Sequence, residues 1–188
     1  MMTDTPNCPF DELKDMLVSP VGVVKTSLKE PLPVSQDGET GTEEHIRRLR
    51  EYNKRVKSLE SQLIIFPELQ DMLKGIEEFS HILVLYWAHL VPEARRKGTS
   101  QVHPMGRKDI PKKGIFSTCT PVRPNPILLS PVRLVSRKGN VLVVRGLEAL
   151  DGSPILDKKP YIKGYHCIEG ATVPKWMKRL REEMGDNS

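Results

Sequence analysis

The sequence predicts a mainly β protein: a small single-sheet β-barrel with an inserted helix and a C-terminal helix. Many short apolar and β-branched runs alternate with tight turns, and few helical stretches interrupt them, which is typical of an all-β barrel. The 188 residues, 38% of them hydrophobic, suit one domain with decorations. Because the chain has no Gly-x-Gly-x-x-Gly turn, nothing indicates a Rossmann sheet.

Composition narrows the classes of protein that the chain can represent. The longest apolar run, residues 82–88, is far shorter than the ~18–20 residues of a membrane span. The N-terminus lacks the apolar region of a signal peptide. Cys8, Cys119 and Cys167 are odd in number and widely spaced, which predicts neither a disulfide framework nor a metal site. We expect a reducing, cytoplasmic setting without membrane or metal, and the net charge of +5 permits an anionic partner.

The N-terminal part of the chain divides into an appendage, a strand and a loop. Residues 1–18 form the appendage, ahead of a barrel domain over residues 19–162. Residues 20–26 alternate small and β-branched side chains, which predicts the first strand. The Pro-, Gly- and Ser-rich stretch 29–42 predicts a loop.

Residues 43–63 predict the inserted helix, about five turns long, because apolar side chains recur at heptad spacing: Leu49, Tyr52, Val56, Leu59 and Leu63. Three roles remain open for it. It could lie on the barrel with a solvated charged face, or form a short coiled-coil or dimer contact. It could also contact RNA through Arg47, Arg48, Arg50, Lys54, Arg55 and Lys57.

The middle of the chain predicts a short strand at 64–66, a helical turn at 67–76 and a long strand over 81–89 buried on both faces. Residues 91–113 predict a long loop that is either disordered or faces an anion. Its basic residues are Arg95, Arg96, Lys97, Arg107, Lys108, Lys112 and Lys113.

Two stiff loops stand out in the second half. Residues 118–127 and 151–161 are each punctuated by prolines, which fix φ and lack an N–H. Between them, residues 128–136 and 141–146 predict two strands joined by the hairpin turn 137–140. Within a basic tail over 163–188, residues 174–184 predict a helix with Pro174 in its first turn.

Five motifs in order resemble the TrmO (TsaA-like) family over roughly residues 19–162. They are Pro-x-Gly-x-Val at 20–24, Phe-Pro-Glu at 66–68, Gly-Ile-Glu-Glu-Phe-Ser-His at 75–81, a Gly-x-Phe-x-Thr strand at 114–118 followed by Arg-Pro-Asn-Pro-Ile at 123–127, and Asp-Gly-Ser-Pro through Lys-Pro-Tyr at 151–161. The resemblance implies a small barrel that binds S-adenosyl-L-methionine, usually as a homodimer. It also implies a methyltransferase acting on N6 of threonylcarbamoyladenosine beside the anticodon of tRNA, a base in a single-stranded loop.

The resemblance carries roles to particular residues. It implies cofactor binding by Gln36, Asp37, Gly38, His89, Leu90, Cys119, Leu129, Asp151, Gly152, Ser153 and Pro154. Arg123, Asn125 and Lys159 would position substrate or loops, and Asp157 and Tyr161 would act near the acceptor as catalytic groups. Each of these residues also has a purely structural interpretation. Arg123 and Asn125 could rigidify their own turn, and Asp157 could cap a loop. His89 could be a hydrogen-bonded histidine at the end of a strand.

Three departures from the family pattern keep other functions open. Cys119 stands where the family has arginine, Leu128 where glycine is usual, and Lys158 where isoleucine is usual. A thiol has neither the charge nor the donor fork of a guanidinium. The alternatives are therefore a divergent non-catalytic barrel that binds RNA or a ligand, and a methyltransferase with another acceptor.

Overall fold

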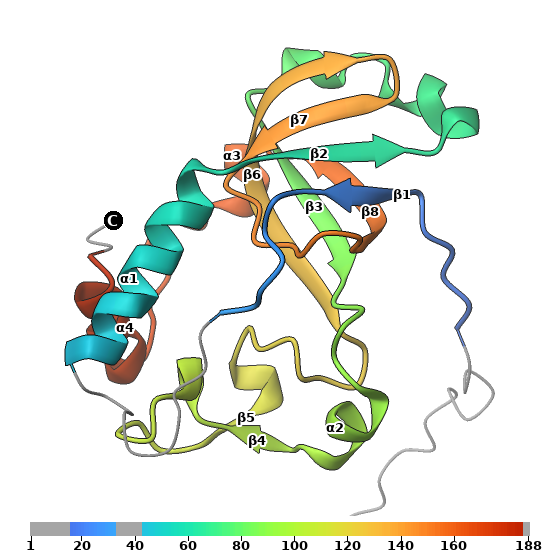
Figure 1. The fold of residues 1–188 in the computed structure, drawn as a ribbon. Helices are drawn as coiled ribbons and strands as arrows, with labels where there is room; N and C mark the ends of the chain where they lie inside the picture. The colour runs from blue at the N-terminus through green and yellow to red at the C-terminus, as the bar shows by residue number, and fades with distance from the viewer. Residues whose placement is uncertain (1–15, 33–42, 186–188) are drawn as a thin grey trace, which may run out of the picture.

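Six antiparallel strands close a barrel in the computed structural model of the chain, which describes residues 16–32 and 43–185. The strand order around the barrel is β1-β2-β7-β6-β3-β8 (Figure 1). This confirms the predicted fold class. The strands are β1 Gly22–Lys25, β2 Glu60–Ile65, β3 His81–Trp87, β6 Ile127–Lys138, β7 Val141–Arg145 and β8 Pro154–Pro160.

The barrel interior is filled by side chains that alternate along the strands, as the period of two in a β-strand requires. Leu63 and Ile65 of β2 point inward, as do Leu142 and Val144 of β7. In β3, residues 82–84 are all buried, which confirms the prediction of a strand covered on both faces. β3 pairs with β6 on one side and with β8 on the other.

Helix α1, Glu43–Ser58, ends one turn earlier than the sequence predicted. The heptad spacing suggested a helix through Leu63, but residues 60–65 form β2 and pair with β1 and β7. Ser61, Leu63 and Ile65 are the buried residues of this segment, a period of two. Strand pairing on both sides outweighs the helical spacing there, so the helix prediction was wrong for 60–63.

The basic segment 91–113 holds short elements that the prediction of a plain loop missed. They are α2 Glu93–Gly98, β4 Gln101–Val102, η3 Pro104–Gly106 and β5 Lys113–Gly114, of which β4 and β5 pair. Residues 115–117 form the 3₁₀ turn η4 Ile115–Ser117, so the strand predicted at 114–118 was also wrong. The remaining short helices are η1 Pro67–Leu73, η2 Ile76–Glu78 and α3 Lys163–His166.

The second proline-punctuated loop is mostly the strand β8 and not a loop. Its prolines occupy the two ends of the strand, Pro154 and Pro160. Proline is tolerated at such positions because a missing N–H costs least where the ladder begins or stops. The hairpin of β6 and β7 is confirmed, with Gly139 in its turn at a φ of 60°.

Helix α4, Lys175–Glu183, docks beside α1 on one flank of the barrel (Figure 1). Arg107, fully shielded from solvent, donates to both oxygens of Asp109 at 2.7 Å and to Glu183 Oε2 at 2.5 Å. Arg179 bonds the same two carboxylates at 2.9 and 2.8 Å. These contacts hold the pKa of Asp109 and Glu183 below their ordinary values, with the Arg107 hydrogen bonds as the main cause. Ion pairs therefore hold α4 against the segment that contains Arg107 and Asp109.

Within the described ranges no helix is long and apolar enough to cross a membrane. The same residues contain no group of three or more potential metal ligands.

Candidate functional site

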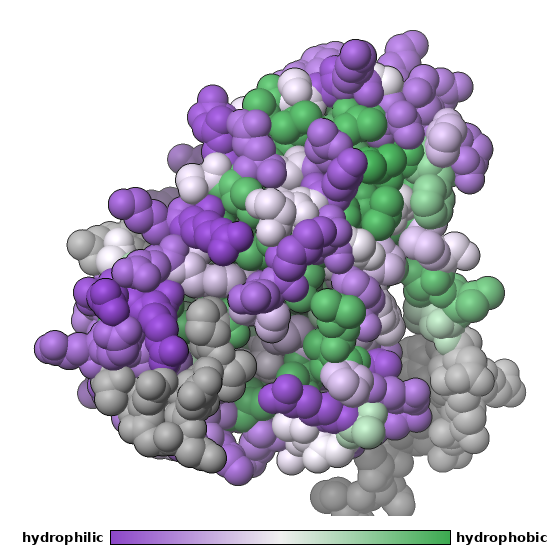
Figure 2. Space-filling view, in the orientation of Figure 1, coloured by the Kyte–Doolittle hydropathy of each residue, from purple (hydrophilic) through white to green (hydrophobic). Residues whose placement is uncertain are grey.

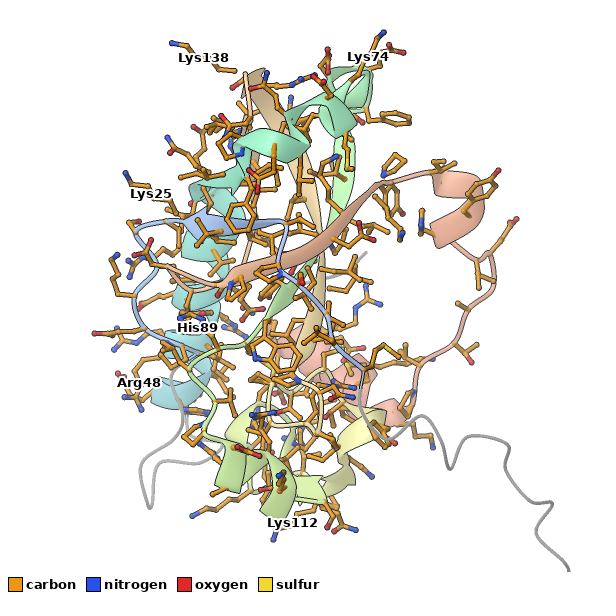
Figure 3. The ribbon with its side chains drawn as sticks, turned by 90° about the vertical axis from the view of Figure 1, so that its right-hand side faces the viewer. Lys25, Arg48, Lys74, His89, Lys112 and Lys138 are labelled. Carbon is orange, nitrogen blue, oxygen red and sulfur yellow. The ribbon has the colours of Figure 1, made fainter. Side chains whose placement is uncertain are left out.

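Three motif segments meet at one end of the barrel, where β3 ends and β6 and β8 begin. Trp87 pairs with Ile127, and the N–H of Ala88 donates to the carbonyl of Pro126 at 2.9 Å. These contacts place the Arg-Pro-Asn-Pro-Ile loop against the end of β3. His89 follows directly and approaches the turn that leads into β8 (Figure 3).

The turn at residues 151–154 lies against His89. Gly152 has a φ of 79°, a left-handed conformation that favours glycine. A Cβ at this position would lie 3.7 Å from His89 Nε2, so the backbone of the turn comes close to the imidazole. The hydroxyl of the buried Ser153 lies 3.4 Å from His89 Nδ1. The structure thus brings together five of the predicted cofactor residues: His89, Asp151, Gly152, Ser153 and Pro154.

Strand β1 and the segment after it anchor this turn. Val24 of β1 makes two backbone hydrogen bonds to the turn, accepting from Gly152 N and donating to Ser153 O, each at 2.9 Å. Asp151 accepts the N–H of Thr26 at 2.9 Å and forms an ion pair with Lys29. The hydrogen bond from Lys29, followed by that from Thr26, lowers the pKa of Asp151. Asp151 is therefore an ionised group that fixes the turn.

The loop at 118–127 is braced from both sides. Arg123 donates to the carbonyls of Thr118 and Thr120, at 3.3 Å each, so its contacts stay inside the loop. Arg96 lies over the ring of Trp87, 5.8 Å from its centroid, and donates to Pro124 O at 3.1 Å. Arg96 was not among the predicted site residues, although the basic run 95–97 pointed to its segment. It clamps the proline loop onto the end of β3.

Several predicted residues of this end are open to solvent. Cys119 is a free, exposed thiol, and the Asn125 side chain is also exposed. Leu90 is 60% exposed and directly follows His89. Leu128, the residue in place of a family glycine, packs against the barrel core opposite Tyr86. Its side chain is therefore accommodated inside the barrel.

Leu129 and Asp157 lie in a different place, on the outer face of the barrel. Both are register partners of Leu85, one on each side of it. Asp157 accepts the N–H of Lys158 at 2.7 Å and forms an ion pair with Lys159 at 2.9 Å. Both contacts of this carboxylate thus lie within β8 itself.

Tyr161 lies at the opposite end of the barrel from His89. Its N–H donates to His81 O at 3.0 Å, and its ring stacks on His166 at 5.2 Å. The seven residues of β8 separate it from the turn at 151–154, a length of about 20 Å for an extended strand. Within one copy, the structure does not bring the predicted catalytic Tyr161 to the predicted cofactor residues. Gln36, Asp37 and Gly38 lie outside the described residues.

Sequence reasoning missed one acid beside two tyrosines near the same end. Glu148 keeps solvent contact along its side chain, but protein atoms crowd its carboxyl, and this desolvation raises its pKa. Burial raises the pKa of Tyr86 to about 12, and burial followed by the Glu148 charge raises that of Tyr52. Tyr86 also lies 3.4 Å from the Ser130 hydroxyl. Glu148 had no recognisable motif around it, and Tyr52 was predicted only as one of the heptad-spaced residues of the inserted helix.

Comparison with known proteins shows which proteins this chain is similar to. The family model of the tRNA-methyltransferase O N-terminal domain matches residues 50–167. A probable S-adenosyl-L-methionine-binding protein of Pyrococcus abyssi is 37% identical over 85% of this chain and 75% of its own length. One of Methanothermobacter thermautotrophicus is 41% identical over 78% of this chain and 90% of its own. A mouse tRNA (adenine(37)-N6)-methyltransferase is 36% identical over 63% of this chain but only 27% of that protein.

Solved structures show the same fold. The crystal structure of TrmO from Pseudomonas aeruginosa is 24% identical and superposes with a TM-score of 0.61. The match covers 86% of this chain, which spans only 62% of that solved protein.

Proposed function

The chain belongs to the tRNA-methyltransferase O family, and on that premise we propose that it transfers a methyl group from S-adenosyl-L-methionine to N6 of an adenosine in tRNA. The acceptor that we propose is threonylcarbamoyladenosine next to the anticodon. Two exposed free thiols, Cys119 and Cys167, support a reducing, cytoplasmic setting.

The observation that carries the proposal is the meeting of His89, the turn at 151–154 and the proline loop at one barrel end. S-adenosyl-L-methionine, when bound, supplies a methyl group activated by a positive sulfonium. The residues present fit such a group. Gly152 leaves backbone accessible without a Cβ, Asp151 is ionised, and the exposed Leu90 offers an apolar contact. His89, Leu90 and residues 151–154 would hold the cofactor.

Methyl transfer depends mainly on alignment of nucleophile, methyl group and sulfur, and rigid loops supply alignment. The Arg96 clamp and the Asp151 anchors hold the two loops in place, while Ser153 orients His89. The N6 nucleophile must also lose a proton. Glu148, whose pKa desolvation raises, is the group that we propose to accept it.

We further propose a homodimer that covers the outer face of β3 and β6. Ile127, Leu129 and Val135 of β6 are 40 to 57% exposed there, next to Asp157 of β8. In a two-fold pair each copy uses the same surface. Such a pair could bring Asp157 and Tyr161 of one copy towards the cofactor turn of the other, which would restore the predicted catalytic role that a single copy does not support.

The test is a calorimetric titration of S-adenosyl-L-methionine into the protein and into a Cys119→Arg variant, followed by methylation of tRNA with and without threonylcarbamoyladenosine. We expect micromolar binding by the native chain and transfer to the modified tRNA. Binding only by the variant would mean that the native chain has lost the family chemistry.

The exposed Cys119, with no guanidinium in its place, favours a second candidate: a non-catalytic barrel that binds RNA. This candidate predicts a tRNA gel shift without any cofactor binding. A methyltransferase with another acceptor predicts the reverse, cofactor binding without tRNA affinity at low salt.

A further inference from the structure

We propose that the groove between α1 and α4 binds backbone phosphates of tRNA, as a second contact separate from the barrel end. This inference rests on the proposed tRNA substrate and assigns a surface to it.

The groove is an open recess of roughly 300 Å³. Arg50, Lys54 and Lys57 lie at i, i+4 and i+7 on one face of α1, and such residues are neighbours on a helix surface. The other lining residues are Asn53, Ser58 and Met184. The groove therefore offers three cations and an amide, which are groups that contact nucleic-acid phosphates.

The net charge of the protein is concentrated in the two helices that form this groove. Helix α1 carries six basic and three acidic side chains, and α4 carries four basic and two acidic. Together they account for the whole formal charge of +5. The acids of α1 lie in its first nine residues, and none lies in the segment 52–58 that faces the groove. A concentrated positive field of this kind attracts polyanions.

Two carboxylates that adjoin the groove in sequence, Glu183 and Glu60, are already engaged elsewhere. Glu183 bonds Arg107 at 2.5 Å and Arg179 at 2.8 Å, and Glu60 bonds Arg145 at 2.6 Å. Arg50 donates through Nε to the main-chain carbonyl of Glu183, which fixes its guanidinium at the groove edge. In the part of the chain that the structure describes, no ion pair involves Lys54 or Lys57, and both are exposed. Their charges are therefore available to a ligand.

The position of the groove favours RNA over a small anion. Figure 1 shows α1 and α4 side by side on the flank of the barrel, and Figure 2 shows hydrophilic side chains gathered over that flank. An open, shallow surface suits an extended backbone with successive phosphates, whereas small ligands favour concave sites that bury most of their surface.

The test compares two double variants that each remove two positive charges. Lys54→Gln with Lys57→Gln alters the groove. Lys74→Gln with Lys138→Gln alters two exposed lysines at the far end of the barrel (Figure 3). Fluorescence anisotropy would measure the Kd of an unmodified tRNA between about 50 and 200 mM salt. We expect the groove variant to bind at least about tenfold more weakly at low salt, with the slope of log K against log salt reduced by about two. The control variant should keep the wild-type slope.

Unchanged slopes in both variants, or equal losses in both, would overturn the inference. Calorimetry with S-adenosyl-L-methionine should give the same Kd for the groove variant and the wild type, which verifies that the barrel end is intact. The two proposals can fail separately. Groove-dependent tRNA binding without any methyl transfer would contradict the proposed function alone, and methyl transfer with a wild-type slope in the groove variant would contradict the groove alone.

Discussion

Different interactions stabilise the barrel and its helical flank, which consists of α1 and α4. The barrel is held by backbone pairing around an apolar core, in which residues such as Leu63, Leu142 and Ile155 are completely buried. The flank is held by the Arg107, Asp109, Arg179 and Glu183 network, with Leu180 as the one fully covered apolar residue of α4. Burial of apolar area is largely insensitive to pH and salt, while ion pairs are not. The difference predicts that the two regions can be disrupted independently.

The largest effect is expected from Gly22→Ala in the barrel. A Cβ at Gly22 would lie 2.3 Å from the Ile64 carbonyl oxygen, so β1 and β2 would have to separate. Such overpacking should lower the free energy of unfolding by about 3 kcal/mol. Urea unfolding followed by circular dichroism would measure it. Gly114→Ala is the matched control, because nothing lies within 4 Å of its Cβ position. Equal stability of the two variants would contradict the role of close backbone approach.

The next effect is expected from Arg107→Met on the flank. The change leaves Asp109 and Glu183 without their shielded partner, and removing one member of a buried pair costs about 3–5 kcal/mol. Since both carboxylates are partly exposed and still contact Arg179, we expect about 2 kcal/mol.

This loss should be local to the flank. Hydrogen exchange should show faster exchange across α4 with little change in the barrel strands. Arg179→Met, at an exposed member of the same network, should leave exchange in α4 nearly unchanged. Equal loss of protection in barrel and flank would mean that they unfold as one unit.

The smallest effect is expected from Glu148→Gln, which probes the junction between the two regions. Burial raises the pKa of Glu148 above its ordinary value of 4.5, so the folded state binds the proton more tightly than the unfolded state. Its contribution to stability is complete below about pH 4.5 and is lost as the pH rises towards the folded pKa. The free energy of unfolding, measured from pH 4 to 7, should therefore fall more steeply with pH for the wild type than for the variant. Parallel curves would contradict a desolvated carboxyl.

The local pattern of residues determined the barrel. The β-branched run at 20–26, the apolar run at 82–88 and the hairpin turn near Gly139 each specify a strand or turn through side-chain period and backbone freedom, and all three were predicted correctly. The same reasoning failed at residues 60–63, where helical spacing and strand alternation coincide. It also failed at 154–160, where prolines at both ends suggested a loop. Pairing with neighbouring strands decided both segments, and such pairing is not visible in a local window.

The motifs predicted the residues of the candidate site, and only the tertiary structure decided which of them meet. His89 and Ser153 are separated by 64 residues yet lie within hydrogen-bond distance, because β3 ends where β8 begins. Tyr161 follows Ser153 closely in sequence but lies at the opposite barrel end, because an extended strand carries the chain away from the turn. Sequence alone therefore determined the family and the motifs, while strand register and the closure of the barrel determined the site.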